Sequence, residues 1–252
     1  NMKANKVKII LIVLFMMSCA VTFLFSSFFE LREIIIQEDT VGILNTFKDK
    51  KMIIGHNLNT MLISKGNILS GHLDKIENEI KKDVNIKEIS IKRTGNNSLR
   101  VDYTKRVPIM CVLYDDYVIY FDYDGTIIDT SKSKNEKSVL IKGINLNSFH
   151  FGFNLIACND MLEDISLLCK EIEKYDIANY TAIRTLIDEI EIKDANRIVI
   201  RYDNRLEILV DLTSNVKYNA NVICSILSNI SQKAKGYIDF TISTVPYFTP
   251  VP

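Results

Sequence analysis

Two carboxylates at the end of an apolar run are the residues of this chain best suited to chemistry. The stretch from Val118 to Asp129 reads VIYFDYDGTIID and places Asp122 and Asp124 two residues apart. A carboxylate after a buried strand can act as a nucleophile, and a second one can act as general acid beside Mg²⁺. The same letters also predict a hairpin, because Asp-Gly between apolar runs is a strong short-range turn signal.

The enzymatic reading of these residues has a specific form. The stretch is similar to the Asp-x-Asp-Gly-Thr signature of haloacid-dehalogenase-type phosphatases, in which Asp122 would be the nucleophile and Asp124 the general acid. That fold requires strands and helices in alternation around a parallel sheet. Here another short strand and the polar loop SKSKNEK (residues 131–137) follow instead. We therefore favour the hairpin and keep a membrane-anchored phosphatase as the alternative.

Other catalytic or cofactor-binding patterns are missing from the sequence. It contains no GxSxG, no HExxH and no Walker loop. Its five cysteines form no CxxC pair, and its three histidines have no ligand-like spacing. We expect buried, reduced cysteines, although a structural disulfide stays possible, and we expect no metal and no cofactor. The formal net charge of zero gives no electrostatic case for binding nucleic acid.

The segment from Ile9 to Phe29 predicts a membrane helix. Its 21 residues carry no charge, proline or glycine, and a helix of that length spans about 30 Å. The lysines at positions 3, 6 and 8 precede it, so the positive-inside rule predicts a cytoplasmic N-terminus and an extracytoplasmic C-terminus. A cleaved signal peptide is the rival interpretation, but the apolar run is long and lacks an Ala-x-Ala site.

Residues 30–104 predict a first small domain with the order β-α-α-β-β. Residues 31–37 read as a strand, and Asp39-Thr40 could cap a helix over residues 41–47. After a connector at residues 53–58, Ser70 is expected to cap a helix with apolar positions at Leu73, Ile76 and Ile80. Two alternating strands then flank a turn at residues 95–97.

Residues 105–245 predict a larger mixed domain, and residues 246–252 a tail. Short strands are expected near residues 109–113, 118–121 and 126–128, then a helix from Asp160 and a meander over residues 187–210. A second helix is expected from about Lys217 to Lys235, with Gly236 ending it as the C′ residue. The last strand is expected at residues 237–243, with the prolines at 246, 250 and 252 ending the pattern. The fold class is α+β, with a mainly antiparallel sheet and flanking helices.

The order of several local patterns resembles the bacterial cell-division family FtsQ/DivIB. The stretch IIGHN (residues 53–57) is similar to that family's G-x-N, and VNIKEISIKR (residues 84–93) to its P-x-V-x-x-A-x-V-x-R. LRVDYTKRVP (residues 99–108) resembles its L-x-I-x-V-x-E-R-x-P, with Lys105 in place of Glu. The hairpin at Tyr120–Thr126, the VLIKG of residues 139–143 and the GYIDF of residues 236–240 follow in the family's order.

This resemblance implies a non-enzymatic division scaffold with a POTRA domain and a β domain. The implied partners are membrane-anchored FtsL and DivIC/FtsB-type proteins and, indirectly, septal peptidoglycan synthases, and the implied place is the division septum. The implied partner-binding strand comprises Tyr237, Ile238, Phe240, Ile242, Ser243 and Val245, since a bare sheet edge can pair with another strand. Arg106 and Pro108 are expected to order the domain junction. A POTRA protein of another export or sporulation complex is a further alternative.

Overall fold

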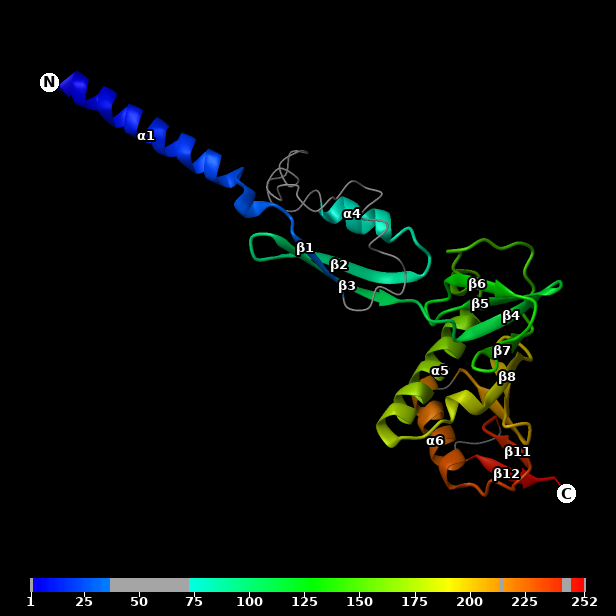
Figure 1. Cartoon of the computed structure of the whole chain (residues 1–252). Helices are drawn as coiled ribbons and strands as arrows, with labels where there is room; N and C mark the ends of the chain where they lie inside the picture. Colours follow the sequence, from blue (N-terminus) through cyan, green and yellow to red (C-terminus); the bar gives the residue numbers. More distant parts are fainter. Residues whose placement is uncertain (1, 37–72, 214, 242–245, 252) are drawn as a thin grey trace. The chain divides into compact units, whose positions relative to one another are not determined.

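The computed structural model describes residues 2–36, 73–213, 215–241 and 246–251 (Figure 1). The chain divides into two compact units, Asn1–Lys105 and Arg106–Pro252. The break falls one residue after the boundary expected from the sequence. Each unit is described by itself below.

The N-terminal helix α1 (Met2–Leu24) is long and apolar enough to cross a membrane. Its stretch Lys6–Leu24 has a mean hydropathy of 2.5. The helix ends five residues earlier than the expected Phe29, because Ser26 takes an extended conformation and opens the 3₁₀ turn η1 (Ser27–Phe29). The rings of Phe23, Phe28 and Phe29 pack together at this turn, with centroids 5.2–5.8 Å apart.

The first unit also contains a three-stranded sheet in the order β1-β3-β2. Strand β1 (Glu33–Ile36) runs parallel to β3 (Ser98–Lys105), and β2 (Ile86–Thr94) runs antiparallel to it. The expected hairpin at residues 95–97 is confirmed. Helix α4 (Leu73–Ile80) packs on the sheet through Ile76 and Ile80, as its spacing predicts. The expected helix at residues 41–47, the connector at 53–58 and the cap at Ser70 lie outside the described residues.

The second unit is built on a nine-stranded sheet in the order β12-β11-β10-β9-β8-β7-β4-β5-β6. Five of its neighbouring pairs are antiparallel, and three are parallel, namely β10–β11, β4–β7 and β7–β8. The α+β class with a mainly antiparallel sheet is therefore confirmed. The strands are β4 (Met110–Tyr114), β5 (Tyr117–Phe121), β6 (Ile127–Ser131), β7 (Val139–Lys142), β8 (Ile187–Ile192), β9 (Arg197–Tyr202), β10 (Leu206–Asp211), β11 (Gly236–Asp239) and β12 (Tyr247–Pro250).

Two helices cover one face of this sheet. Helix α5 (Asp160–Asn179) and helix α6 (Val216–Asn229) contact each other and bury their apolar sides against the strands (Figure 1). The side chains of Asn159 and Asn215 cap the two helices by accepting backbone N–H bonds from Met161 and Tyr218. Two short 3₁₀ turns, η2 (Ile156–Cys158) and η3 (Arg184–Leu186), lie on either side of α5 in the chain.

The end of α6 differs from the prediction. The helix stops at Asn229, because Ile230 is already extended, and Gly236 begins strand β11 rather than closing the helix. The glycine has another role there. A Cβ at position 236 would lie 2.1 Å from the carbonyl oxygen of Thr249 on β12. Gly236 is thus required by the close approach of the neighbouring strand.

Candidate partner-binding edge

Strand β12 forms one outer edge of the nine-stranded sheet. It pairs antiparallel with β11, with Tyr237 opposite Thr249 and Ile238 opposite Phe248. All four residues of β12 are exposed, including Tyr247 at 56% and Phe248 at 41%. Aromatic side chains on an accessible strand suit contact with another protein, because they bury a large area with little conformational freedom to lose.

The expected partner strand is corrected by this arrangement. Strand β11 ends at Asp239, whose carboxylate accepts hydrogen bonds from the N–H and the hydroxyl of Thr241 and so turns the chain out of the strand. Because β12 then pairs with its outer side, β11 is an interior strand. The edge expected at residues 237–245 is instead formed by Tyr247–Pro250.

The residues expected to bind a partner have different positions. Tyr237 is 44% exposed, whereas Ile238 is 1% exposed and belongs to the core. Phe240 is half-buried and packs against the same core. Ile242, Ser243 and Val245 lie outside the described residues. The sequence pattern does not predict a strand at Tyr247 and Phe248, because the prolines around them normally end one.

The backbone N–H and C=O groups of successive β12 residues point alternately toward β11 and away from it. The N–H of Val251 donates to the carbonyl of Lys235 at 3.0 Å, so every second residue of β12 bonds to β11, and those between direct their backbone groups outward. The outward residues of β12 are Phe248 and Pro250. Proline has no N–H, and Pro246, the next residue in the alternation, also lacks one.

The sheet face opposite α5 and α6, here called the open face, carries one row of side chains across all nine strands. Each member is the direct register partner of the next. The row starts with exposed Asp129, continues with buried Tyr120 and Cys111, and becomes charged and then exposed toward β12. It runs Asp129, Tyr120, Cys111, Leu140, Glu189, Arg201, Glu207, Tyr237 and Thr249.

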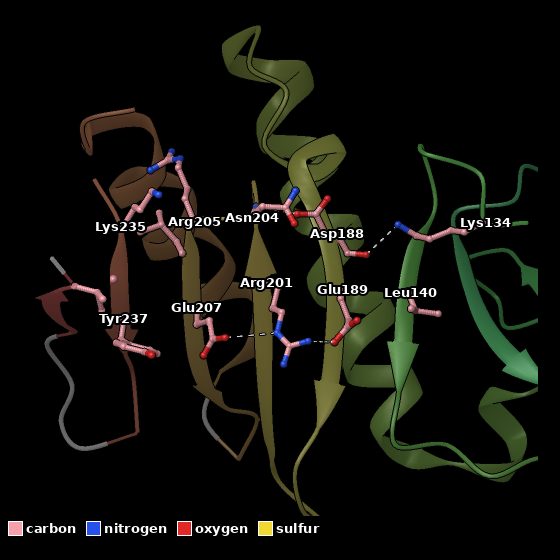
Figure 2. Close-up of a pocket in the computed structure, with 13 residues that line it drawn as sticks. Lys134, Leu140, Asp188, Glu189, Arg201, Asn204, Arg205, Glu207, Lys235 and Tyr237 are labelled. Carbon is pink, nitrogen blue, oxygen red and sulfur yellow. Dashed lines mark hydrogen bonds and ion pairs between the residues drawn. The ribbon is translucent and has the colours of Figure 1, made fainter. Parts of the chain in front are cut away.

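Arg201 is the centre of the charged part of the open face (Figure 2). Its guanidinium pairs with Glu189, with Glu191 at 3.4 Å and with Glu207 at 3.5 Å. Lys142 bonds Glu189 from the other side at 2.6 Å. A hydrogen bond from Lys193 lowers the pKa of Glu191. These cross-strand pairs tie β7 to β10 and neutralise one another.

A groove of about 550 Å³ lies on the open face and runs across this network, from Leu140 on β7 to the β11–β12 edge. Figure 2 shows Tyr237 on one side, Arg201 between Glu207 and Glu189 in the middle, and Leu140 with Lys134 on the other side. Val251, Lys235 and Arg205 also line it. Arg205 is held in place by the carbonyls of Ser231 and Ala234, at 3.3 and 2.9 Å, and by Asp203 at 2.8 Å. The groove is continuous with the exposed edge.

Asp122 is a structural turn residue in this fold. Its side chain is buried in the connection between antiparallel β5 and β6. One carboxylate oxygen accepts the N–H groups of Asp124 and Thr126, both at 3.0 Å, and the other pairs with Arg106. The hairpin interpretation of the Asp-x-Asp-Gly-Thr stretch is thus the one that the geometry follows.

Arg106 and Pro108 begin the second unit. Arg106 also lies 3.4 Å from the Asp124 carboxylate, so it holds the first residues of this unit to the β5–β6 turn. Pro108 is half-buried beside Tyr120 and Asp129. Within the described residues, no group of three or more His, Cys, Asp or Glu side chains is arranged to hold a metal ion.

The fold and the edge define a class of protein. It is an α+β protein with an N-terminal helix able to cross a membrane and a sheet whose last strand is accessible to another chain. No protein-family model matches the sequence. A cell division protein DivIB from Clostridium tetani (strain Massachusetts / E88) is 24% identical over 210 residues, which cover 79% of this chain and 75% of that protein.

A solved structure is also similar. The major extracytoplasmic domain of the trans isomer of the bacterial cell division protein DivIB from Geobacillus stearothermophilus overlays with a TM-score of 0.33 and 11% identity. The overlay covers 51% of this chain and 99% of that domain, and at this TM-score it says nothing further about the fold. The Clostridium tetani relative agrees with the resemblance of the ordered sequence motifs to the FtsQ/DivIB family and supports a cell-division protein.

Proposed function

We propose that this chain is a membrane-anchored, non-enzymatic scaffold of the bacterial cell-division machinery. Helix α1 is the anchor, with the N-terminus in the cytoplasm and the chain after the helix outside, as the lysines at its start favour. The first unit is a POTRA-like domain and the second a β domain. The protein acts at the division septum, in the same membrane as its partners.

The proposed partners are membrane-anchored proteins of the FtsL and DivIC/FtsB type. A segment of such a partner adds a strand to β12, so that its backbone bonds to the outward groups of Phe248 and Pro250. The single observation that carries this proposal is the exposure of β12, including Tyr247, at the end of the sheet, with exposed Tyr237 on the neighbouring strand. Aromatic anchors next to a backbone edge provide affinity and register together.

The test is capture of membrane partners by the full chain, solubilised in detergent and identified by mass spectrometry. Phe248→Pro removes the outward N–H of β12 but leaves the bonds to β11 in place, because position 248 donates away from β11. We expect partner capture to fall about tenfold or more. Phe248→Val is the matched control, because it shortens the side chain and keeps the N–H.

Two further outcomes have defined meanings. Equal capture by Phe248→Pro and Phe248→Val would show that strand addition at β12 is not the binding mode. Capture of export or sporulation proteins in place of division proteins would show that the chain works in one of those assemblies and not in cell division. Ile35→Lys, at an exposed position of β1, should leave capture unchanged, because it alters an edge in the other unit.

A further inference from the structure

The outward positions of β12 form an edge that is poor in hydrogen-bond donors. Phe248 supplies one N–H and one carbonyl, Pro250 supplies a carbonyl alone, and Pro246 lacks an N–H as well. Between residues 246 and 251, the outward side therefore has a single backbone donor. The carbonyls of these residues remain as acceptors.

This asymmetry affects pairing between two copies of the chain. Any hydrogen bond between two β12 strands needs an N–H from one of them. Each copy has one, so no register between the copies can make more than two bonds. With Phe248 opposite its own symmetry mate, Pro246 faces Pro250 on both sides and neither pair can bond.

A strand from a different protein is not limited in this way. With N–H groups at three alternating positions it can donate to the carbonyls of Pro246, Phe248 and Pro250, and it can accept from the N–H of Phe248. That gives up to four bonds, against two for a self-pair. We infer that Pro246 and Pro250 make the β12 edge selective: they suppress edge-to-edge pairing of this chain with itself and leave it open to a proline-free extended segment of another protein.

The exposed residues around the edge explain why such a device is useful. Tyr247, Phe248 and Val251 leave apolar surface beside an outer strand, and an unprotected strand of this kind is prone to pair with copies of itself. Prolines are tolerated on an outer strand only where the missing N–H faces away from the sheet. Pro250 meets that condition because Thr249 and Val251 make the inward bonds.

The inference rests on the proposed function for the identity of the partner, but its test uses self-association. Pro250→Thr adds one outward donor per copy, so a self-pair rises from two possible bonds to four. For the full chain in detergent micelles, sedimentation should show dimerisation at least about tenfold tighter than in the wild type. The amide of Phe248 should then exchange more slowly with deuterium as protein concentration rises.

The matched control is the double variant Phe248→Pro with Pro250→Thr. It again has one outward donor, placed at residue 250, and we expect the self-association of the wild type. Dimerisation of Pro250→Thr no tighter than that of the wild type would overturn the inference, and so would a wild-type Phe248 amide that is already protected at high concentration. The proposed function would be contradicted by a different result, namely failure of the wild type to capture a division protein.

Discussion

The nine-stranded sheet has two outer strands, and they are protected in different ways. At the β6 end, the chain's own segment 152–155 runs alongside the strand. The N–H of Ile127 donates to the carbonyl of Phe153, and that of Gly152 donates to Ile127, both at 2.9 Å. At the β12 end no described segment covers the strand, and prolines occupy outward positions instead. The first arrangement already bonds the backbone of Ile127 at the start of β6, and the second removes donors from β12 but keeps acceptors.

This difference leads to different expectations for the two ends of the sheet. The covered end is supported by buried polar contacts, including the Asp122 turn and the bonds of the Tyr120 hydroxyl to Ser133 and Asn135, at 2.8 and 2.7 Å. The β12 end is held by four residues of pairing and has exposed aromatic side chains. Changes at the first end should therefore alter stability, and changes at the second should alter binding.

Asp122→Ala should produce the largest loss of stability. It removes the buried carboxylate that pairs with Arg106. It also removes the acceptor of the N–H groups of Asp124 and Thr126. We expect the free energy of unfolding to fall by about 3 kcal/mol. Urea unfolding followed by circular dichroism measures this, with Asp116→Ala, an exposed acidic position in the β4–β5 turn, as control within about 0.5 kcal/mol. Equal effects of the two variants would contradict the structural role of Asp122.

Gly236→Ala should detach the β12 end. A Cβ there meets the backbone of β12 at 2.1 Å, which no side-chain rotation relieves, so the outer pairing must shift at a cost of about 2 kcal/mol. The amide of Thr249 should lose protection from deuterium exchange. Gly95→Ala is the control, because Gly95 also has positive φ but no atom lies within 4 Å of its added Cβ. Unchanged protection at Thr249 would mean that β12 is not held as described.

A smaller effect is the loss of stability at alkaline pH that results from the buried thiol of Cys111 on β4. Burial raises the pKa of the Cys111 thiol to about 11, from the ordinary value of 9.0. Because the folded pKa is the higher one, the stability contribution is complete below about pH 9 and is lost as pH rises toward 11. Between these values each such thiol changes the free energy of unfolding by about 1.4 kcal/mol per pH unit. Cys111→Ala should reduce the measured slope by that amount; an unchanged slope would show that the thiol is accessible to solvent in the folded state.

Much of the fold could be predicted from local patterns. The alternation Ile198, Ile200, Tyr202 predicted the meander, and the apolar spacing after Asp160 predicted α5, because each burial pattern repeats with the period of its element. The register between β4, β7 and β8 could not be predicted. These strands are parallel neighbours joined by long connections, so their alignment depends on packing against α5, and the row across the open face follows from it.

The edge itself was misplaced for an identifiable reason. Proline normally ends a strand, so the sequence predicts a tail over residues 246–252. The signal that could have found β12 is the placement of Pro246 and Pro250 four residues apart, on either side of Tyr247 and Phe248. Prolines restricted to alternate positions are typical of an outer strand whose missing donors face solvent.

The most direct test of the central claim is site-specific crosslinking in intact membranes. One variant of the full chain carries a photoreactive amino acid at position 247 of β12. A second variant carries it at position 35 of β1. We predict crosslinks from position 247 to a single-pass division protein, lost when Phe248→Pro is added and absent from position 35. Crosslinking of that partner from position 35 alone, or from position 247 with undiminished yield in Phe248→Pro, would contradict partner binding by strand addition at β12.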